Sequence, residues 1–229
     1  MATTGLTERV RSVPRPPAVL ERDREAALSE RQRELLDVLV LIFDKGFVHL
    51  TMADLARELN CSLRTLYGLA PSRNELVLLV VDRNLRSIGR SANDCIDPAM
   101  SAIEAVRAYL QGATEAVSAT TEEFAADMVV IEGGPELGAR HSEYLVAVTR
   151  AILDFGVDSG EICDVDTAAA ARVMAGLGRE FARPEVIPKL RTNPKKAADA
   201  MVEIVLAGLT SAPAGCAFST PTTKDQAQS

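Results

Sequence analysis

Residues 42–76 constrain the fold of this chain more than any other stretch, because they contain three helix starts in close succession. Gly46 ends the first helix, since glycine is the residue that most often adopts the left-handed conformation after a helix. Thr51 then supplies a side-chain oxygen that can cap a short helix over residues 52–59. The spacing therefore predicts a helix, a glycine-containing loop and a second, capped helix.

The turn after this short helix is equally well marked. Asn60 tolerates the positive φ of a tight turn, and Ser62 can cap another short helix over residues 63–68. Ser72 begins the next helix, with Glu75 three residues later completing a capping box. Two short helices joined by so tight a turn are typical of a helix-turn-helix, whose second helix enters the DNA major groove. The stretch therefore predicts DNA binding.

The same residues resemble the N-terminal domain of the tetracycline-repressor (TetR) family of bacterial transcription regulators. The matching features are Phe43 with Gly46, Thr51 with Leu55-Ala56, Leu59-Asn60-Cys61-Ser62, Thr65-Leu66-Tyr67 and Ser72 to Leu76. The chain departs from the family pattern at Leu69-Ala70, where His-Phe is usual. The resemblance covers roughly residues 30–80, and beyond them only the helical pattern matches. It implies a C-terminal domain that binds a small effector and dimerises through its last two helices.

Helical signals continue along most of the chain, and no useful length of strand-like alternation interrupts them. The predicted fold is all-α, with a three-helix helix-turn-helix domain over residues 29–90, which include the start of a connecting helix. A helical domain over residues 91–212 follows, and the resemblance assigns effector binding and dimerisation to it. The expected helices after the helix-turn-helix span residues 72–89, 98–118, 120–132, 135–155, 167–181 and 194–210.

The two ends of the chain differ from this pattern. Residues 1–28 hold five arginines among prolines and acids, and three of the prolines forbid a helix through the middle of the segment. They predict a disordered basic arm, or alternatively an arm that reaches into an adjacent minor groove. Residues 213–229 are rich in Thr, Ser, Gln and Ala and predict a disordered tail.

Composition restricts the partners. The net charge is −7, but the basic residues are concentrated in the half that holds the helix-turn-helix, whereas the acidic excess lies in the C-terminal half and would orient the molecule on DNA. No apolar run could span a bilayer, which predicts a cytoplasmic protein with no membrane partner. The four cysteines are scattered, so they indicate reduced thiols and neither disulfides nor a zinc site. No cofactor is expected.

Seven residues are candidates for DNA binding: Thr51, Ser62, Leu63, Arg64, Thr65, Tyr67 and Arg73. Arg64 is the only long donor at the start of the recognition helix, where a bidentate contact to guanine contributes about 1–3 kcal/mol of discrimination; a phosphate contact is its alternative. Leu63 could pack on a thymine methyl or simply be exposed. The resemblance implies a backbone or base contact for Tyr67, against a partly buried ring. The two hydroxyl caps and Arg73 favour phosphate because they flank helix N-termini, although capping competes for the hydroxyls.

The last two predicted helices are rich in alanine and glycine, which lets helix backbones approach closely. They could pack on a second copy or on their own core, and the resemblance favours a homodimer. A two-fold dimer implies a palindromic operator in double-stranded DNA. Candidate effector-lining residues are Met100, Tyr109, Met128, Glu132, Tyr144 and Phe181, although the pattern favours ordinary core over ligand contact for each of them. With no Trp and 4% aromatic residues, the cavity is expected to be aliphatic and the effector apolar.

An enzyme is the weakest hypothesis, because the motifs of zinc proteases, serine hydrolases and nucleotide-binding proteins are missing. Glu132, Glu136 and His141 could form an acid-base or metal group, or merely a solvated helix junction, and we expect no catalysis. The sequence predicts a ligand-responsive homodimeric transcriptional regulator that acts as a repressor. The alternative, favoured by Leu69-Ala70, is a small-molecule-binding helical protein of the same fold that does not bind DNA.

Overall fold

The computed structural model describes residues 5–116, 121–181, 183 and 185–210, and within them all regular secondary structure is helical. The all-α prediction is confirmed. The elements are α1 (Leu6–Arg11), α2 (Arg22–Ala26), α3 (Glu30–Phe43), α4 (Met52–Glu58), α5 (Leu63–Leu69), α6 (Arg73–Asp94), α7 (Ala102–Ala116), α8 (Glu122–Val130), α9 (Gly134–Asp158), α10 (Thr167–Phe181), the 3-10 helix η1 (Ile187–Lys189) and α11 (Pro194–Thr210).

The predicted caps account for the starts of the short helices. The Thr51 side chain accepts a hydrogen bond from the Asp54 backbone while the Asp54 side chain accepts from the Thr51 backbone, which forms a capping box. Ser62 caps α5 by accepting from the Thr65 backbone. The turn between α4 and α5 has its left-handed residue at Asn60, with φ 47°, and α3 is followed by Gly46 at φ 94°. Local side-chain chemistry therefore fixes this helix-turn-helix.

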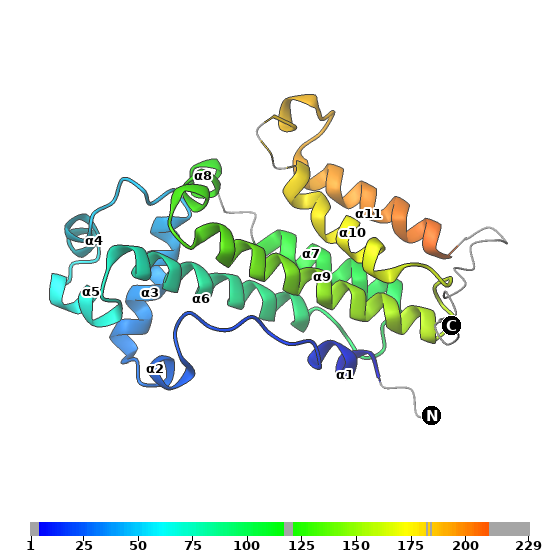
Figure 1. Ribbon diagram of the computed structural model, residues 1–229, viewed down its shortest axis with the longest axis horizontal. Helices are drawn as coiled ribbons and strands as arrows, with labels where there is room; N and C mark the ends of the chain where they lie inside the picture. The colour runs from blue at the N-terminus through cyan, green and yellow to red at the C-terminus, as the bar shows by residue number, and fades with distance from the viewer. Residues whose placement is uncertain (1–4, 117–120, 182, 184, 211–229) are drawn as a thin grey trace, which may run out of the picture.

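The buried side chains form two hydrophobic cores, and helix α6 contributes to both (Figure 1). The first core joins α3, α4 and α5 to the N-terminal half of α6, and the second joins α1, α7, α9, α10 and α11 to residues near the end of α6. Helix α6 runs from the first core to the second, beside α9, and α4 and α5 lie at one end of the elongated molecule (Figure 1). The boundary predicted after residue 90 falls inside α6, so one continuous helix spans both regions.

Two helix starts differ from their predicted positions. Helix α7 begins at Ala102, because Ser101 and Glu104 form reciprocal hydrogen bonds there and Asp97 accepts from the backbone of Ala99 in the preceding turn. The side chain of Thr121 accepts from the Phe124 backbone and caps α8. The helix predicted from residue 120 therefore starts slightly later than expected.

The prediction of a disordered arm is wrong for residues 5–28. Leu6 and Val10 of α1 are buried in the second core, and Leu20 is buried in the first. The prolines do prevent a helix between α1 and α2, but the extended residues 12–21, here called the N-terminal strap, lie along α6. Helix α1 is at the opposite end of the molecule from α4 and α5, which argues against a minor-groove arm (Figure 1).

Residues 1–4 and the predicted tail over 213–229 lie outside the described residues. In the ranges that the structure does describe, none of the helices combines the length and the hydrophobicity that a membrane crossing requires.

Candidate nucleic-acid interface

The recognition helix α5 is strongly two-sided. Leu66 and Leu69 are buried in the first core, whereas Leu63 and Tyr67, one helical turn apart, are 44% and 52% exposed. Arg64 is exposed beside them. Because residues four apart lie on one helix face, these three side chains form a single outward surface. The structure thus brings together three of the seven predicted DNA-binding residues, while their contact with DNA stays a prediction.

The departure from the TetR-family pattern does not disturb this unit. Leu69 and Ala70 are each only 2% exposed and belong to the first core. Helix α5 continues through Leu69, one residue beyond the predicted end. The residues that replace the usual His-Phe pair therefore pack into the small domain.

The hydroxyl groups of Thr51 and Ser62 both make hydrogen bonds within the helices that they cap. The Thr51 hydroxyl donates to the Asp54 carboxylate at 2.5 Å, and hydrogen bonds from Thr51 hold the pKa of Asp54 below its ordinary value. Ser62 Oγ lies 2.9 Å from Oγ1 of half-buried Thr65. A fully ionised Asp54 repels phosphate, so capping is the role that the structure favours for Thr51. Ser62 and Thr65 remain candidates at the N-terminus of the recognition helix.

The Arg73 guanidinium is hydrogen-bonded to backbone carbonyls of the protein itself. Its Nε donates to the carbonyl of Leu50 at 2.5 Å, and its Nη2 donates to the carbonyls of Phe47 and Val48, the latter at 3.0 Å. The guanidinium is therefore turned onto the loop that connects α3 to α4 and not toward solvent. These hydrogen bonds support the loop, and a phosphate contact by Arg73 stays a prediction.

The same loop is held from the other side by α8. Asp127 Oδ2 accepts hydrogen bonds from the backbone of Phe47 and of Val48, the latter at 2.7 Å. The Thr121 hydroxyl donates to the Asp44 carbonyl at 2.8 Å, and the Phe124 ring packs edge-on against Phe47 with centroids 5.7 Å apart. These partners are about 80 residues apart in the sequence, and no local pattern signals them. Helix α8 is thereby attached directly to the helix-turn-helix.

Substituting Arg73 by glutamine is expected to lower the free energy of unfolding by about 1–3 kcal/mol, because three carbonyl groups lose a charged donor. Urea denaturation measures the change. The exposed Arg64→Gln variant is the matched control and should change stability by less than about 0.5 kcal/mol. A fully stable R73Q protein that bound DNA weakly, with a lower salt dependence, would identify Arg73 as a phosphate contact.

The six candidate effector residues do not converge on one cavity. Tyr109 is 1% exposed in the second core, and Met128 packs against the first. Met100 and Phe181 are half-buried, and Glu132 is exposed with its carbonyl bound to Asn74. Tyr144 lines a pocket beside α6. The six residues are thus divided between the two cores and the surface, and an effector cavity lined by them stays a prediction.

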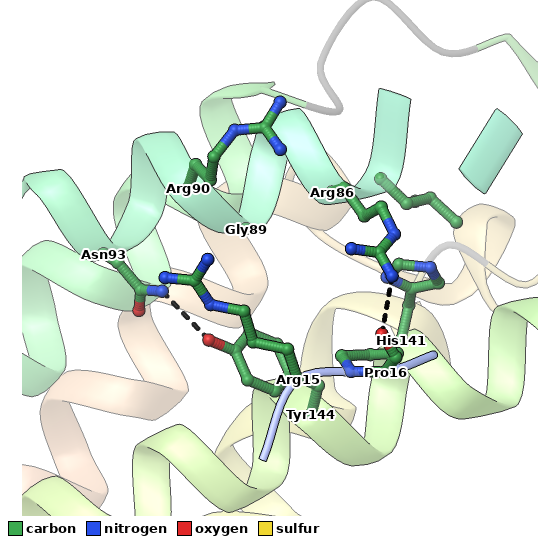
Figure 2. A pocket seen from close by; sticks show the side chains of 9 residues that line it. Arg15, Pro16, Arg86, Gly89, Arg90, Asn93, His141 and Tyr144 are labelled. Atoms are coloured by element: carbon green, nitrogen blue, oxygen red, sulfur yellow. Dashed lines mark hydrogen bonds between the residues drawn. The ribbon is translucent and has the colours of Figure 1, made fainter. Parts of the chain in front are cut away.

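The pocket that Tyr144 lines lies between α6, α9 and the N-terminal strap (Figure 2). Its volume is about 30 Å³, and its polar lining includes three arginines and an asparagine that the sequence interpretation did not select. These four residues are Arg15, Arg86, Arg90 and Asn93. Three of them follow one another at one-turn spacing on α6, but Arg15 could be placed only once the path of the strap was known.

The acid-base group considered for an enzyme is not assembled either. His141 Nε2 lies 2.9 Å from Asp82 Oδ1, in a largely buried pair on α6 and α9. Glu132 and Glu136 are both exposed. His141 is thus engaged with Asp82, which the sequence interpretation did not connect to it.

Solved structures share this arrangement of helices. One is a TetR transcription regulator from Haloarcula marismortui, which is 16% identical, has a TM-score of 0.64 and matches 80% of this chain and 100% of its own. Another is the TetR family transcriptional regulator PfmR from Thermus thermophilus, with 21% identity, a TM-score of 0.54 and coverage of 76% and 98%. This chain has the TetR-family fold.

A third TetR-fold structure, a transcriptional regulator of that family from Agrobacterium tumefaciens, is 15% identical with a TM-score of 0.60 over 79% of this chain and 98% of its own. The match thus extends over nearly the whole length of each compared protein. No protein-family model matches the sequence, and no curated protein matches it. The TetR-family fold is therefore evident from the helix arrangement at low sequence identity.

Proposed function

We propose that this chain is a cytoplasmic, homodimeric transcriptional regulator that binds a palindromic DNA operator and acts as a ligand-responsive repressor. The observation that carries the proposal is the outward face of α5, where Leu63, Arg64 and Tyr67 are presented on a helix that its Ser62 cap and a buried core hold in place. The N-terminal turn of such a helix approaches base edges in the major groove. The TetR-family fold supports the same function.

The dimer interface in this proposal is the outward face of α10 and α11. Val173, Met201 and Ile204 are 54%, 39% and 63% exposed there, although they are apolar. A Cβ added at Gly176 or at Gly208 would meet no atom within 4 Å, so the chain itself leaves the space beside both glycines open. An exposed apolar face rimmed by small residues favours close packing against a second copy. A two-fold axis there would set two recognition helices on one face of DNA.

Selection of binding sites from random duplex DNA tests the proposal. We expect enrichment of a palindrome whose half-sites are about one helical turn apart, with an affinity that falls steeply as salt rises. Failure of a folded, dimeric protein to enrich any sequence would instead favour the alternative, a small-molecule-binding helical protein that does not bind DNA.

Arg64→Ala is expected to relax the base preference at one position of each half-site and to cost about 1–3 kcal/mol of operator binding, because a bidentate guanine contact is lost. Competition with operators mutated at each position measures the effect. Arg150→Ala is the control, since Arg150 is 56% exposed on α9 and outside α4 and α5. Equal weakening on every sequence would identify Arg64 as a phosphate contact instead.

A further inference from the structure

The outward face of α5 carries little hydrogen-bonding capacity for its size. Arg64 is the only charged donor of this helix, and the half-buried Thr65 hydroxyl lies 2.9 Å from Ser62 Oγ. The large exposed side chains beside Arg64 are Leu63 and Tyr67, at 44% and 52% exposure. Apart from the base that Arg64 reaches, discrimination by this face therefore depends largely on apolar contact.

Leu63 differs from the other leucines of α5 because it is not in the core. Leu66 and Leu69 are 0% and 2% exposed and belong to the first core. Single exposed apolar side chains are common on protein surfaces. Leu63, however, lies in the first turn of the recognition helix, the part that approaches base edges, and Tyr67 follows it one turn later on the same face. The two side chains form an apolar strip beside Arg64.

Gly68 adds a second feature to the outward face, one helical turn beyond Arg64. It is exposed, its φ is not positive, and an added Cβ would meet no atom within 4 Å. Because alanine is the better helix former, neither the conformation nor the packing of this chain requires glycine here. Its effect is to leave the α5 backbone uncovered, so that another molecule can approach it closely.

Thymine is the base that matches an apolar strip of this kind. Its C5 methyl group lies in the major groove, where aliphatic side chains can contact it. Neighbouring residues have Cα atoms about 3.8 Å apart, close to the spacing of about 3.4 Å between successive base pairs. A thymine contacted by Leu63 therefore lies within about two base pairs of the base that Arg64 contacts.

We propose that Leu63 selects a thymine in each operator half-site by packing on its C5 methyl group. Tyr67 extends the apolar surface, and Gly68 lets α5 lie deep enough in the groove for the contact. Helix α5 is at the end of the molecule away from α10 and α11, so the proposed dimer interface leaves this face open (Figure 1). The inference rests on the proposed function and deepens it, because it names a second base feature that the recognition helix reads.

Operators that contain deoxyuridine test the proposal, since uracil keeps every hydrogen-bonding group of thymine and lacks only the methyl group. The probe is the palindrome enriched by site selection, with each thymine of the half-site replaced in turn in both halves. One replacement, within about two base pairs of the position relaxed by Arg64→Ala, should weaken binding about tenfold because two methyl contacts are lost. Equal affinity for all the uracil duplexes, or a half-site without thymine in that range, would overturn the proposal.

A double-mutant cycle assigns the contact to its side chain. Leu63→Ala should bind the thymine and uracil operators with equal affinity. Leu41→Ala is the matched control, because Leu41 is 65% exposed on α3 and outside α4 and α5, and it should keep the preference of the parent protein for thymine. An L63A protein that kept this preference would refute the role of Leu63.

The role of Gly68 is tested by adding a side chain. Gly68→Leu should weaken operator binding about tenfold or more, because the added atoms crowd the close contact with DNA, and it should not lower the urea midpoint of the free protein. Gly138→Leu, at an open position on α9, is the control and should leave operator affinity unchanged. Parental operator affinity in G68L would contradict the close approach of α5.

Failure of this inference can be distinguished from failure of the proposed function. A folded, dimeric protein that enriches no DNA sequence would refute the regulator and thymine selection together. An enriched operator whose affinity does not respond to the loss of any thymine methyl group would refute thymine selection and leave the regulator standing.

Discussion

Replacing Asp82 by alanine is expected to lower the free energy of unfolding by about 3–5 kcal/mol, because it breaks a buried ionic network from one side. The carboxylate is 4% exposed. It accepts from the Val19 backbone and from Arg86 Nε, each at 3.0 Å, and lies 2.9 Å from His141 Nε2. Without it, the Arg86 guanidinium and the His141 ring lose their carboxylate, and the strap loses an anchor on α6.

The effect of this substitution should depend on pH. Burial by itself raises the pKa of Asp82, but the hydrogen bonds from His141 and Val19 and the charge of Arg86 outweigh it and hold the pKa below its ordinary value of 3.8. A depressed folded-state pKa means that the stabilisation is fully present above the unfolded pKa. It is lost as pH falls through the lowered folded pKa. The gap between parent and D82A should therefore be widest near neutral pH and narrow below about pH 4.

Urea denaturation at neutral pH and in acid measures both effects. Asp37→Ala is the matched control, since Asp37 pairs with Arg83 but its side chain is 66% exposed, and it should cost less than about 1 kcal/mol. Equal midpoints for D82A and the parent protein at neutral pH would mean that this network does not stabilise the fold.

The parts of the fold that follow from neighbouring residues were predictable from sequence. Thr51 and Ser62 cap the helices they were expected to cap, and Asn60 adopts the expected positive φ. In each case the partner lies within three residues, so hydrogen-bonding chemistry alone decides the outcome. The helical period likewise separates buried Leu66 from exposed Tyr67.

The contacts that sequence did not reveal are all distant along the chain. Asp82 and His141 are 59 residues apart, and Val19 is 63 residues from Asp82. The prolines of the strap break the helical pattern and favour disorder, yet three isolated apolar side chains, Leu6, Val10 and Leu20, are enough to bury the segment at both ends. This burial could not be predicted from the segment itself, because the surfaces on which it packs are formed by helices distant in the sequence, such as α6 and α9.

The candidate DNA-binding residues differ in how far the sequence predicts their roles, and the reason is again the distance between partners along the chain. The outward positions of α5 follow from its period, but the role of Arg73 depends on three carbonyls of the loop from Phe47 to Leu50. A cation at a helix start is compatible with phosphate binding or with a backbone contact, and local sequence does not distinguish them. The position of the loop in the folded structure does distinguish them, and it favours hydrogen bonds from Arg73 to the backbone carbonyls.

Ile204→Glu is expected to convert the protein to a monomer and to weaken operator binding about 100-fold or more. Ile204 is 63% exposed on α11, next to the small residues of the proposed interface. A carboxylate at this position would be desolvated in the dimer without a partner, which strongly disfavours association. A monomer binds one half-site and loses the avidity of the second, which accounts for the size of the effect.

Sedimentation and operator titration of the same preparation measure both consequences. Because Ile204 is largely exposed, the folded monomer should keep its helical circular dichroism. Val129→Glu is the control, since Val129 is 72% exposed on α8 and outside α10 and α11; this variant should remain dimeric and bind the operator normally. A dimeric I204E protein with parental affinity would place the two-fold contact on another face, and dissociation of V129E would point to α8.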